Sequence, residues 1–210
     1  MGSAQNLFIW ALQLWGNGGD IFDEDYRPVF NSPEGVEATE LYASLADIGT
    51  ESQFSDIEGD AATAVRTGGA AMFISWWWYT PTFEDPETTA EEVIGNIAHA
   101  PVPSFPGQEP SSLALSSPQS DREVVLDKSD PATTTVVVSH SSNLVDPEVN
   151  EVNGGLHESA APGLANSRLM PLIPEWAEVA SILEVAVNDI ALGADVQATL
   201  DEAAADVEAV

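Results

Sequence analysis

The chain contains no cysteine and very few basic residues. Five Lys and Arg face 35 Asp and Glu among its 210 residues, the formal net charge is −30, and Lys128 is the only lysine. The lack of cysteine excludes disulfides, thiolate metal sites and a lipid anchor on a cysteine of this sequence. The strong negative field makes nucleic acid and anionic membrane surfaces poor partners.

The charge itself has a physical cost that salt removes. Self-repulsion destabilises a compact chain at low ionic strength, whereas molar salt shortens the Debye length to about 3 Å. The acidic residues are spread along the whole sequence and accompany six Trp and seven Phe, which argues against a disordered acidic tail. We therefore interpret the composition as that of a halophile protein of the haloarchaeal type.

Long apolar runs and targeting signals are also missing. No run approaches the ~20 residues that a transmembrane helix needs. The first residues, Met1 to Asn6, have no basic n-region and no cleavage pattern, so neither a signal peptide nor a lipobox is predicted.

Helical patterns recur along the chain. Ser32 as N-cap and Pro33 at the first helical position predict a helix start. Its apolar face continues at helical spacing through Ala38, Leu41, Tyr42, Leu45 and Ile48. Residues 60–66 predict a short helix. Trp176 begins a stripe that Gly193 ends, and Asp195 caps a last helix.

Strand patterns alternate with these helices. Residues 70–74 form a compact apolar run typical of a buried strand, and residues 93–102 predict a further strand before a proline cluster. Strands alternating with helices predict an α/β layer fold.

Four segments in order resemble the second half of the family 1 extracellular solute-binding proteins of ABC transporters, the class of the maltose-binding protein. The segments are residues 18–34 with the helix that follows, 66–74, 146–149, and 171–176 with the closing helices. The resemblance implies a type II periplasmic-binding-protein-like fold, mainly the C-terminal lobe with its closing C-terminal helices, and it implies that the N-terminal lobe is absent.

The resemblance also implies a division of the chain into three segments. It implies a lobe segment with a Trp cluster over residues 1–110, an irregular or degenerate crossover over 111–142, and a C-terminal helical segment over 143–210. Between residues 116 and 135 the chain departs from the family, whose members usually continue with an aromatic-rich amphipathic helix. We interpret this stretch as a deletion or a degenerate segment. Because the resemblance also lacks the N-terminal lobe, we expect a truncated receptor.

The function that the resemblance implies is solute binding for an ABC importer, with no catalysis and no cofactor. The solute would be a sugar or oligosaccharide, and the partners would be the permease subunits. A betaine-like cation stays open as solute, because aromatic rings attract quaternary ammonium groups. The family works outside the cell or at its surface; a truly truncated chain without export signals is expected to be cytoplasmic.

Trp76, Trp77, Trp78 and Tyr79 are the sharpest feature of the sequence. A strand alternates its faces, so four consecutive large aromatics cannot all enter one core. Flat indoles suit the apolar faces of sugar rings. The resemblance implies, by position, that Trp78 is a ligand-binding aromatic, and Trp77 is a second candidate; core packing and lobe contact are the alternative.

Three further tryptophans are candidate ligand-binding residues by resemblance. Trp176 lies close to where the family places another stacking aromatic, although it also begins an apolar helix stripe. Trp10 and Trp15 precede a Gly-rich turn, in the segment where family members line the cleft. Core burial is the alternative for each of the three.

No catalytic or metal-binding pattern stands out. The carboxylates are too abundant to single out an acid–base pair, and His99, His140 and His157 show no paired ligand spacing. Two other hypotheses stay open: a fragment of a carbohydrate-active enzyme, since glycosidases also combine Trp subsites with carboxylates, and a non-functional remnant of a receptor gene.

Overall fold

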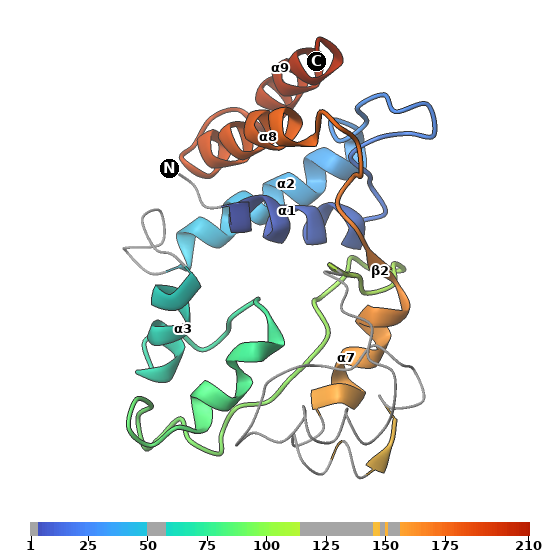
Figure 1. Ribbon diagram of the computed structural model, residues 1–210. Helices are drawn as coiled ribbons and strands as arrows, with labels where there is room; N and C mark the ends of the chain where they lie inside the picture. The colour runs from blue at the N-terminus through green and yellow to red at the C-terminus, as the bar shows by residue number, and fades with distance from the viewer. Residues whose placement is uncertain (1–3, 50–57, 114–144, 148–149, 151–155) are drawn as a thin grey trace. The chain divides into compact units, whose positions relative to one another are not determined.

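The computed structural model describes residues 4–49, 58–113, 145–147, 150 and 156–210 (Figure 1). The chain forms two compact units. Unit 1 comprises Met1–Ile57, Pro103–Leu113 and Arg168–Val210, and unit 2 comprises Glu58–Val102 and Ala114–Ser167. Each unit combines segments that are far apart in sequence. Most of the expected crossover, including residues 116–135, lies outside the described residues.

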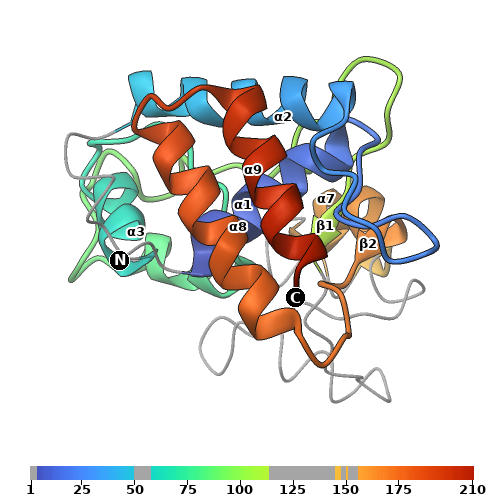
Figure 2. The ribbon, with the colours of Figure 1, turned by 90° about the horizontal axis from the view of Figure 1, so that it is seen from above.

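The described residues of unit 1 form four α-helices. They are α1 (Ala4–Gly16), α2 (Pro33–Ser44), α8 (Trp176–Ala191) and α9 (Val196–Glu208), with a short 3-10 helix, η1 (Leu45–Asp47), after α2. Helices α8 and α9 lie side by side and cover α1 and α2 (Figures 1 and 2). The largest fully buried apolar side chains of this unit are Leu7, Trp10, Leu14, Ile21, Phe30, Leu183, Ile190 and Leu200. Burying each such side chain stabilises the fold by about 1.5–3 kcal/mol.

The start of α2 is as predicted, but its buried face is not. Ser32 accepts a hydrogen bond from the Gly35 N–H, and Pro33 occupies the first turn. The predicted face is wrong at Leu41, which is 40% exposed, and at Ile48, which is 75% exposed and lies beyond the end of the helix at Ser44. Tyr42 and Leu45 are partly buried.

The close approach of α2 to its neighbours explains the buried face. A Cβ on Gly35 would lie 1.9 Å from the backbone oxygen of Phe30, so only glycine fits this contact. One turn later, Thr39 is fully buried and receives a hydrogen bond from Trp10 on α1. Backbone contact and a polar bond, which apolar spacing does not reveal, therefore set the rotation of the helix.

The closing helices agree with the prediction from sequence. The buried residues of α8 are Val179, Leu183, Ala186, Val187 and Ile190. Gly193 follows with a φ of 103°, which favours glycine, and the Asp195 carboxylate accepts from the Ala198 N–H at 2.9 Å to begin α9.

Unit 2 contains α3 (Glu58–Arg66), the 3-10 helix η2 (Trp77–Glu84) and α7 (Leu156–Ala165). Helix α3 includes the short helix predicted at 60–66. The described residues also contain a two-stranded sheet, in which β1 (Ser112–Leu113) pairs with β2 (Ser167–Arg168).

The strands predicted at 70–74 and 93–102 are wrong. The N–H of Ala70 bonds to the Ala64 oxygen and so completes the end of α3, and Met72 is 83% exposed. Around the second segment, the Val93 N–H bonds to Ala90 and Gly95 has a φ of 73°, which makes turns. An apolar run becomes a strand only where a second strand pairs with it, and no described residue pairs with either run.

Within the described part of the chain, none of the helices has the length and apolar character to cross a membrane.

Candidate functional site

The aromatic run in unit 2 begins a 3-10 helix. The backbone of Trp77 and Trp78 forms the first residues of η2, so the alternating strand faces from which the run was interpreted are not present there. Tyr79 is partly buried and packs edge-on against Phe73, with ring centroids 5.8 Å apart. The side chains of Trp77 and Trp78 lie outside the described part of the structure, so their ligand-binding roles stay predictions.

Trp10 lies in the core of unit 1. Its side chain is 0% exposed, its indole N–H donates to the Thr39 hydroxyl at 2.8 Å, and its ring meets Phe30 edge-on with centroids 6.1 Å apart. The indole exposes no surface and its one donor is already used. Core burial, the alternative that the sequence left open, describes this position.

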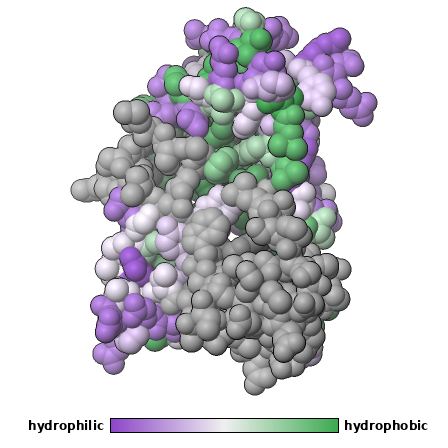
Figure 3. Space-filling model, in the orientation of Figure 1, coloured by the Kyte–Doolittle hydropathy of each residue, from purple (hydrophilic) through white to green (hydrophobic). Residues whose placement is uncertain are grey.

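Trp176 is the first residue of α8 and is partly exposed. Its backbone N–H bonds to the Ile173 oxygen at 3.1 Å, which fixes the turn that leads into the helix. The preceding segment exposes Leu169 by 54% and Leu172 by 87%. Hydrophobic surface shows on unit 1 in Figure 3, among hydrophilic atoms. Trp10 is 0% exposed and Trp15 is 5% exposed, so of the three tryptophans of unit 1 Trp176 has the most surface available to a solute.

Trp15, near the end of α1, is 5% exposed and contacts a cation. The guanidinium carbon of Arg168 lies 5.1 Å from the centroid of its ring, a distance typical of a cation–π contact. Its indole nitrogen is buried and has no hydrogen-bond partner among the described residues. Buried donors in native proteins nearly always find an acceptor in protein, water or ligand, so this N–H calls for an oxygen atom.

Arg168 also pairs with Asp20. Its Nη2 donates to Asp20 Oδ2, and both side chains are partly exposed, at 39% and 42%. The other carboxylate oxygen of Asp20 accepts from the Ile21 N–H at 2.8 Å. We call Trp15, Asp20 and Arg168 the indole–guanidinium cluster. It presents a planar cation, a carboxylate and a buried N–H within unit 1.

Hydrogen bonds fix the turn that follows α1 and leads to Asp20. The Gly19 N–H bonds back to the Leu14 oxygen at 2.9 Å, and Gly18 has a φ of 78°, so the glycines allow the tight turn that leads to Asp20. Asn17 donates to the Glu34 oxygen and to the Glu37 carboxylate, both at 2.9 Å, and so ties the turn to α2.

Sequence reasoning missed Asp20 and Arg168 as a pair. The two residues are 148 positions apart, and no local pattern connects them. One signal was available: Arg168 is one of five basic residues in a chain of net charge −30, so each cation is scarce and its place is informative.

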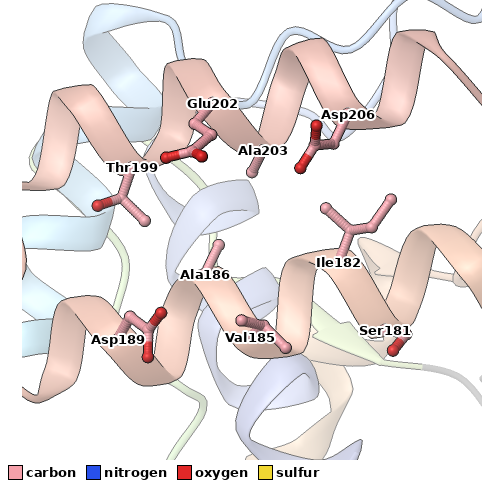
Figure 4. Close-up of a pocket in the computed structure, with 9 residues that line it drawn as sticks. All are labelled: Ser181, Ile182, Val185, Ala186, Asp189, Thr199, Glu202, Ala203 and Asp206. Atoms are coloured by element: carbon pink, nitrogen blue, oxygen red, sulfur yellow. The ribbon is translucent and has the colours of Figure 1, made fainter.

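A groove of about 340 Å³ runs between α8 and α9 (Figure 4). Ile182, Ala186 and Ala203 lie among its apolar lining residues, and Asp189, Glu202 and Asp206 supply carboxylates from both helices. None of the predicted ligand-binding tryptophans lines it, so it does not match the Trp-lined site that the sequence predicted.

The titratable groups that burial perturbs lie elsewhere. Burial lowers the pKa of His157. Burial also lowers the pKa of His99, although the negative charge of Glu84 partly raises it. Burial also raises the pKa of Tyr42 to about 12. Among the described residues, no three His, Cys, Asp or Glu side chains gather in a way that could hold a metal ion.

Comparison with known proteins identifies the fold. No protein-family model and no curated protein matches the chain. The maltose-bound T. maritima MalE3 matches with a TM-score of 0.77 and 20% identity, over 96% of this chain and 56% of its own. An ABC transporter solute-binding protein from Agrobacterium radiobacter K84 in complex with ribitol matches with a TM-score of 0.72 and 24% identity, over 98% of this chain and 56% of its own.

A third match is an ABC transporter solute-binding protein from Thermotoga lettingae TMO bound with α-D-tagatose. It has a TM-score of 0.71 and 19% identity, and the match covers 98% of this chain and 56% of that protein. The chain thus spans little more than half the length of these relatives. At such identities the likeness concerns the fold. The chain therefore has the type II fold of the ABC transporter solute-binding proteins, the class of the maltose-binding protein, as the sequence resemblance implied.

Proposed function

We propose that this chain is part of the substrate-binding component of an ABC importer and that its solute is a sugar or oligosaccharide. The observation that supports this proposal is the match of 96–98% of the chain to structures solved with maltose, ribitol or tagatose. Those relatives are binding proteins rather than enzymes. The proposed protein accordingly does no chemistry, and its specificity is a difference between affinities.

The partners in this proposal are the solute and the membrane permease subunits of the importer. The protein would act outside the cell or at its surface, where it would capture the solute and present it to the permease. The net charge of −30 fits an organism that lives in high salt, because molar salt screens the self-repulsion of the chain.

The proposed contacts divide into aromatic and polar ones. Trp176 offers a partly exposed indole for the apolar face of a sugar ring, and Trp77 and Trp78 are further proposed aromatic contacts. Asp20 and Arg168 are partly exposed polar groups that suit sugar hydroxyls. Trp10, which is fully buried, has no part in the proposal.

Titration of the purified chain tests the proposal. Maltose, tagatose and ribitol are added separately in molar KCl, and tryptophan fluorescence is followed, with glycerol as a control for non-specific effects. We expect a saturable change with at least one of the three ligands and none with glycerol. A chain that is folded by circular dichroism and responds to none of the three ligands would contradict the proposal.

A further inference from the structure

We infer that the indole–guanidinium cluster of Trp15, Asp20 and Arg168 is a subsite for the hydroxyl groups of a neutral sugar or polyol, with Arg168 as its central contact. The inference rests on the proposed function and deepens it, because it names the polar residues that orient the solute and the chemical class that they admit.

Arg168 is held in place on two sides. Its guanidinium lies over the Trp15 ring, with the central carbon 5.1 Å from the ring centroid, and Nη2 is paired with Asp20. A guanidinium has five N–H donors in one plane, and the pair with Asp20 uses only part of them. Because the side chain is 39% exposed, donors that Asp20 does not use are available on a group whose orientation is already fixed.

Trp15 has a different role from the stacking platform that the sequence suggested. Its side chain is 5% exposed and Arg168 covers a face of the ring, so little of the indole remains for a sugar ring. What it still offers is its N–H, which is buried and has no acceptor among the described residues. An oxygen atom of a bound solute would satisfy this donor.

The charges of the cluster favour a neutral solute. Asp20 balances Arg168, so the pair offers acceptor and donor groups side by side without a net charge. A hydroxyl group both donates and accepts, and therefore suits such a pair. A quaternary ammonium ion would meet a guanidinium on the indole face that it needs, and it could not accept from the Trp15 N–H. This arrangement disfavours a solute that binds through its quaternary ammonium group, which is the mode of binding by which the sequence left a betaine-like cation open.

Two substitutions and a matched control test the inference by calorimetric titration with maltose, tagatose and ribitol in molar KCl. Arg168→Ala removes the central donors, and Trp15→Phe removes only the N–H while it keeps an aromatic ring beneath Arg168. The control is Arg27→Ala, which also removes an arginine that pairs with an aspartate. Arg27 lies 3.7 Å from Asp25, and the two side chains are 70% and 72% exposed. Thermal unfolding of each variant checks that it remains folded.

We expect Arg168→Ala to weaken the affinity of the bound sugar by about tenfold or more, and Trp15→Phe by about threefold, since a hydrogen bond with a charged partner is the stronger one. Arg27→Ala should bind within twofold of wild type. Tetramethylammonium serves as the cationic probe: wild type should prefer the sugar, and Arg168→Ala should reduce that preference, which a merely destabilised fold would not do selectively.

The possible failures are distinguishable. If wild type binds a sugar and both Arg168→Ala and Trp15→Phe bind it within twofold of wild type, the inference is overturned and the proposed function stands. If wild type binds tetramethylammonium more tightly than maltose, tagatose and ribitol, the inference on solute class is overturned. If folded wild type binds none of the probes, the proposed function and the inference both fail.

Discussion

The guanidinium of Arg168 lies over the ring of Trp15, with its central carbon 5.1 Å from the ring centroid. Trp15 ends the first helix of the chain, whereas Arg168 begins the segment that leads to the two closing helices. The contact therefore joins the beginning and the end of the sequence within unit 1. It also decides how Trp15 is used: the ring supports a cation, and only its buried N–H remains without a partner among the described residues.

The hydrogen bond between Trp10 and Thr39 should contribute measurably to stability. Thr39→Val keeps the shape of the side chain and leaves the fully buried indole N–H without its acceptor. We expect a loss of about 1–3 kcal/mol in the free energy of unfolding, measured by urea titration in molar KCl. Thr39→Ser, which keeps the hydroxyl, should lose clearly less. Equal losses in the two variants would show that the methyl group and not the hydrogen bond matters.

Two glycines should respond in opposite directions to the same change. In α2, an alanine Cβ at Gly35 would lie 1.9 Å from the Phe30 oxygen, whereas in α3 a Cβ at Gly59 meets nothing within 4 Å. Gly35→Ala should destabilise by about 3 kcal/mol, because backbone must move. Gly59→Ala should stabilise by up to about 1 kcal/mol, because alanine loses less backbone freedom in a helix. Urea unfolding measures both, and a neutral Gly35→Ala would mean that α2 does not approach Phe30 so closely.

The stability of the chain should decrease in mild acid through His157. Burial lowers the pKa of this imidazole below its ordinary value of 6.5, so the folded state favours the neutral ring. As the pH falls below 6.5, the unfolded state takes up a proton more readily than the folded state, and the free energy of unfolding falls.

Urea unfolding of wild type and His157→Gln at pH 7.5 and 5.5 isolates this contribution. Wild type should lose more stability than the variant between the two pH values, because glutamine does not titrate. Parallel losses would show that other groups, His99 among them, account for the whole pH dependence. Molar KCl keeps the screening of the carboxylates the same in every measurement.

Trp176 should affect binding more than stability. It is partly exposed at the start of α8, ahead of the residues that the helix buries. Trp176→Leu should weaken sugar affinity by about fivefold to tenfold, since an aromatic contact of this kind is worth about 1 kcal/mol or more. Leu192→Ala, at the opposite end of α8 and 62% exposed in wild type, is the matched control and should bind normally. Calorimetric titration and a thermal unfolding curve for each variant decide between a ligand contact and a structural role.

The sequence by itself determined the features that short-range chemistry controls. Ser32, Gly193 and Asp195 set helix ends through hydrogen bonds and backbone angles that involve only a few neighbouring residues, and all three predictions are confirmed. The apolar stripe of α8 is likewise confirmed from Val179 onward, where the buried residues of the helix lie in its contacts with α1, α2 and α9. The order of such local signals was also enough to imply the solute-binding fold.

Tertiary structure alone decided the rest, because the deciding partners are distant in sequence. Residues 70–74 have the composition of a strand, but a strand needs a pairing partner, and the Ala70 N–H instead completes α3. Trp10 and Trp15 look alike in the sequence of α1; Thr39 makes one of them a core residue, and Arg168 makes the other a support for a cation. The Arg168–Asp20 pair joins residues 148 positions apart, so only the folded chain brings the proposed hydroxyl subsite together.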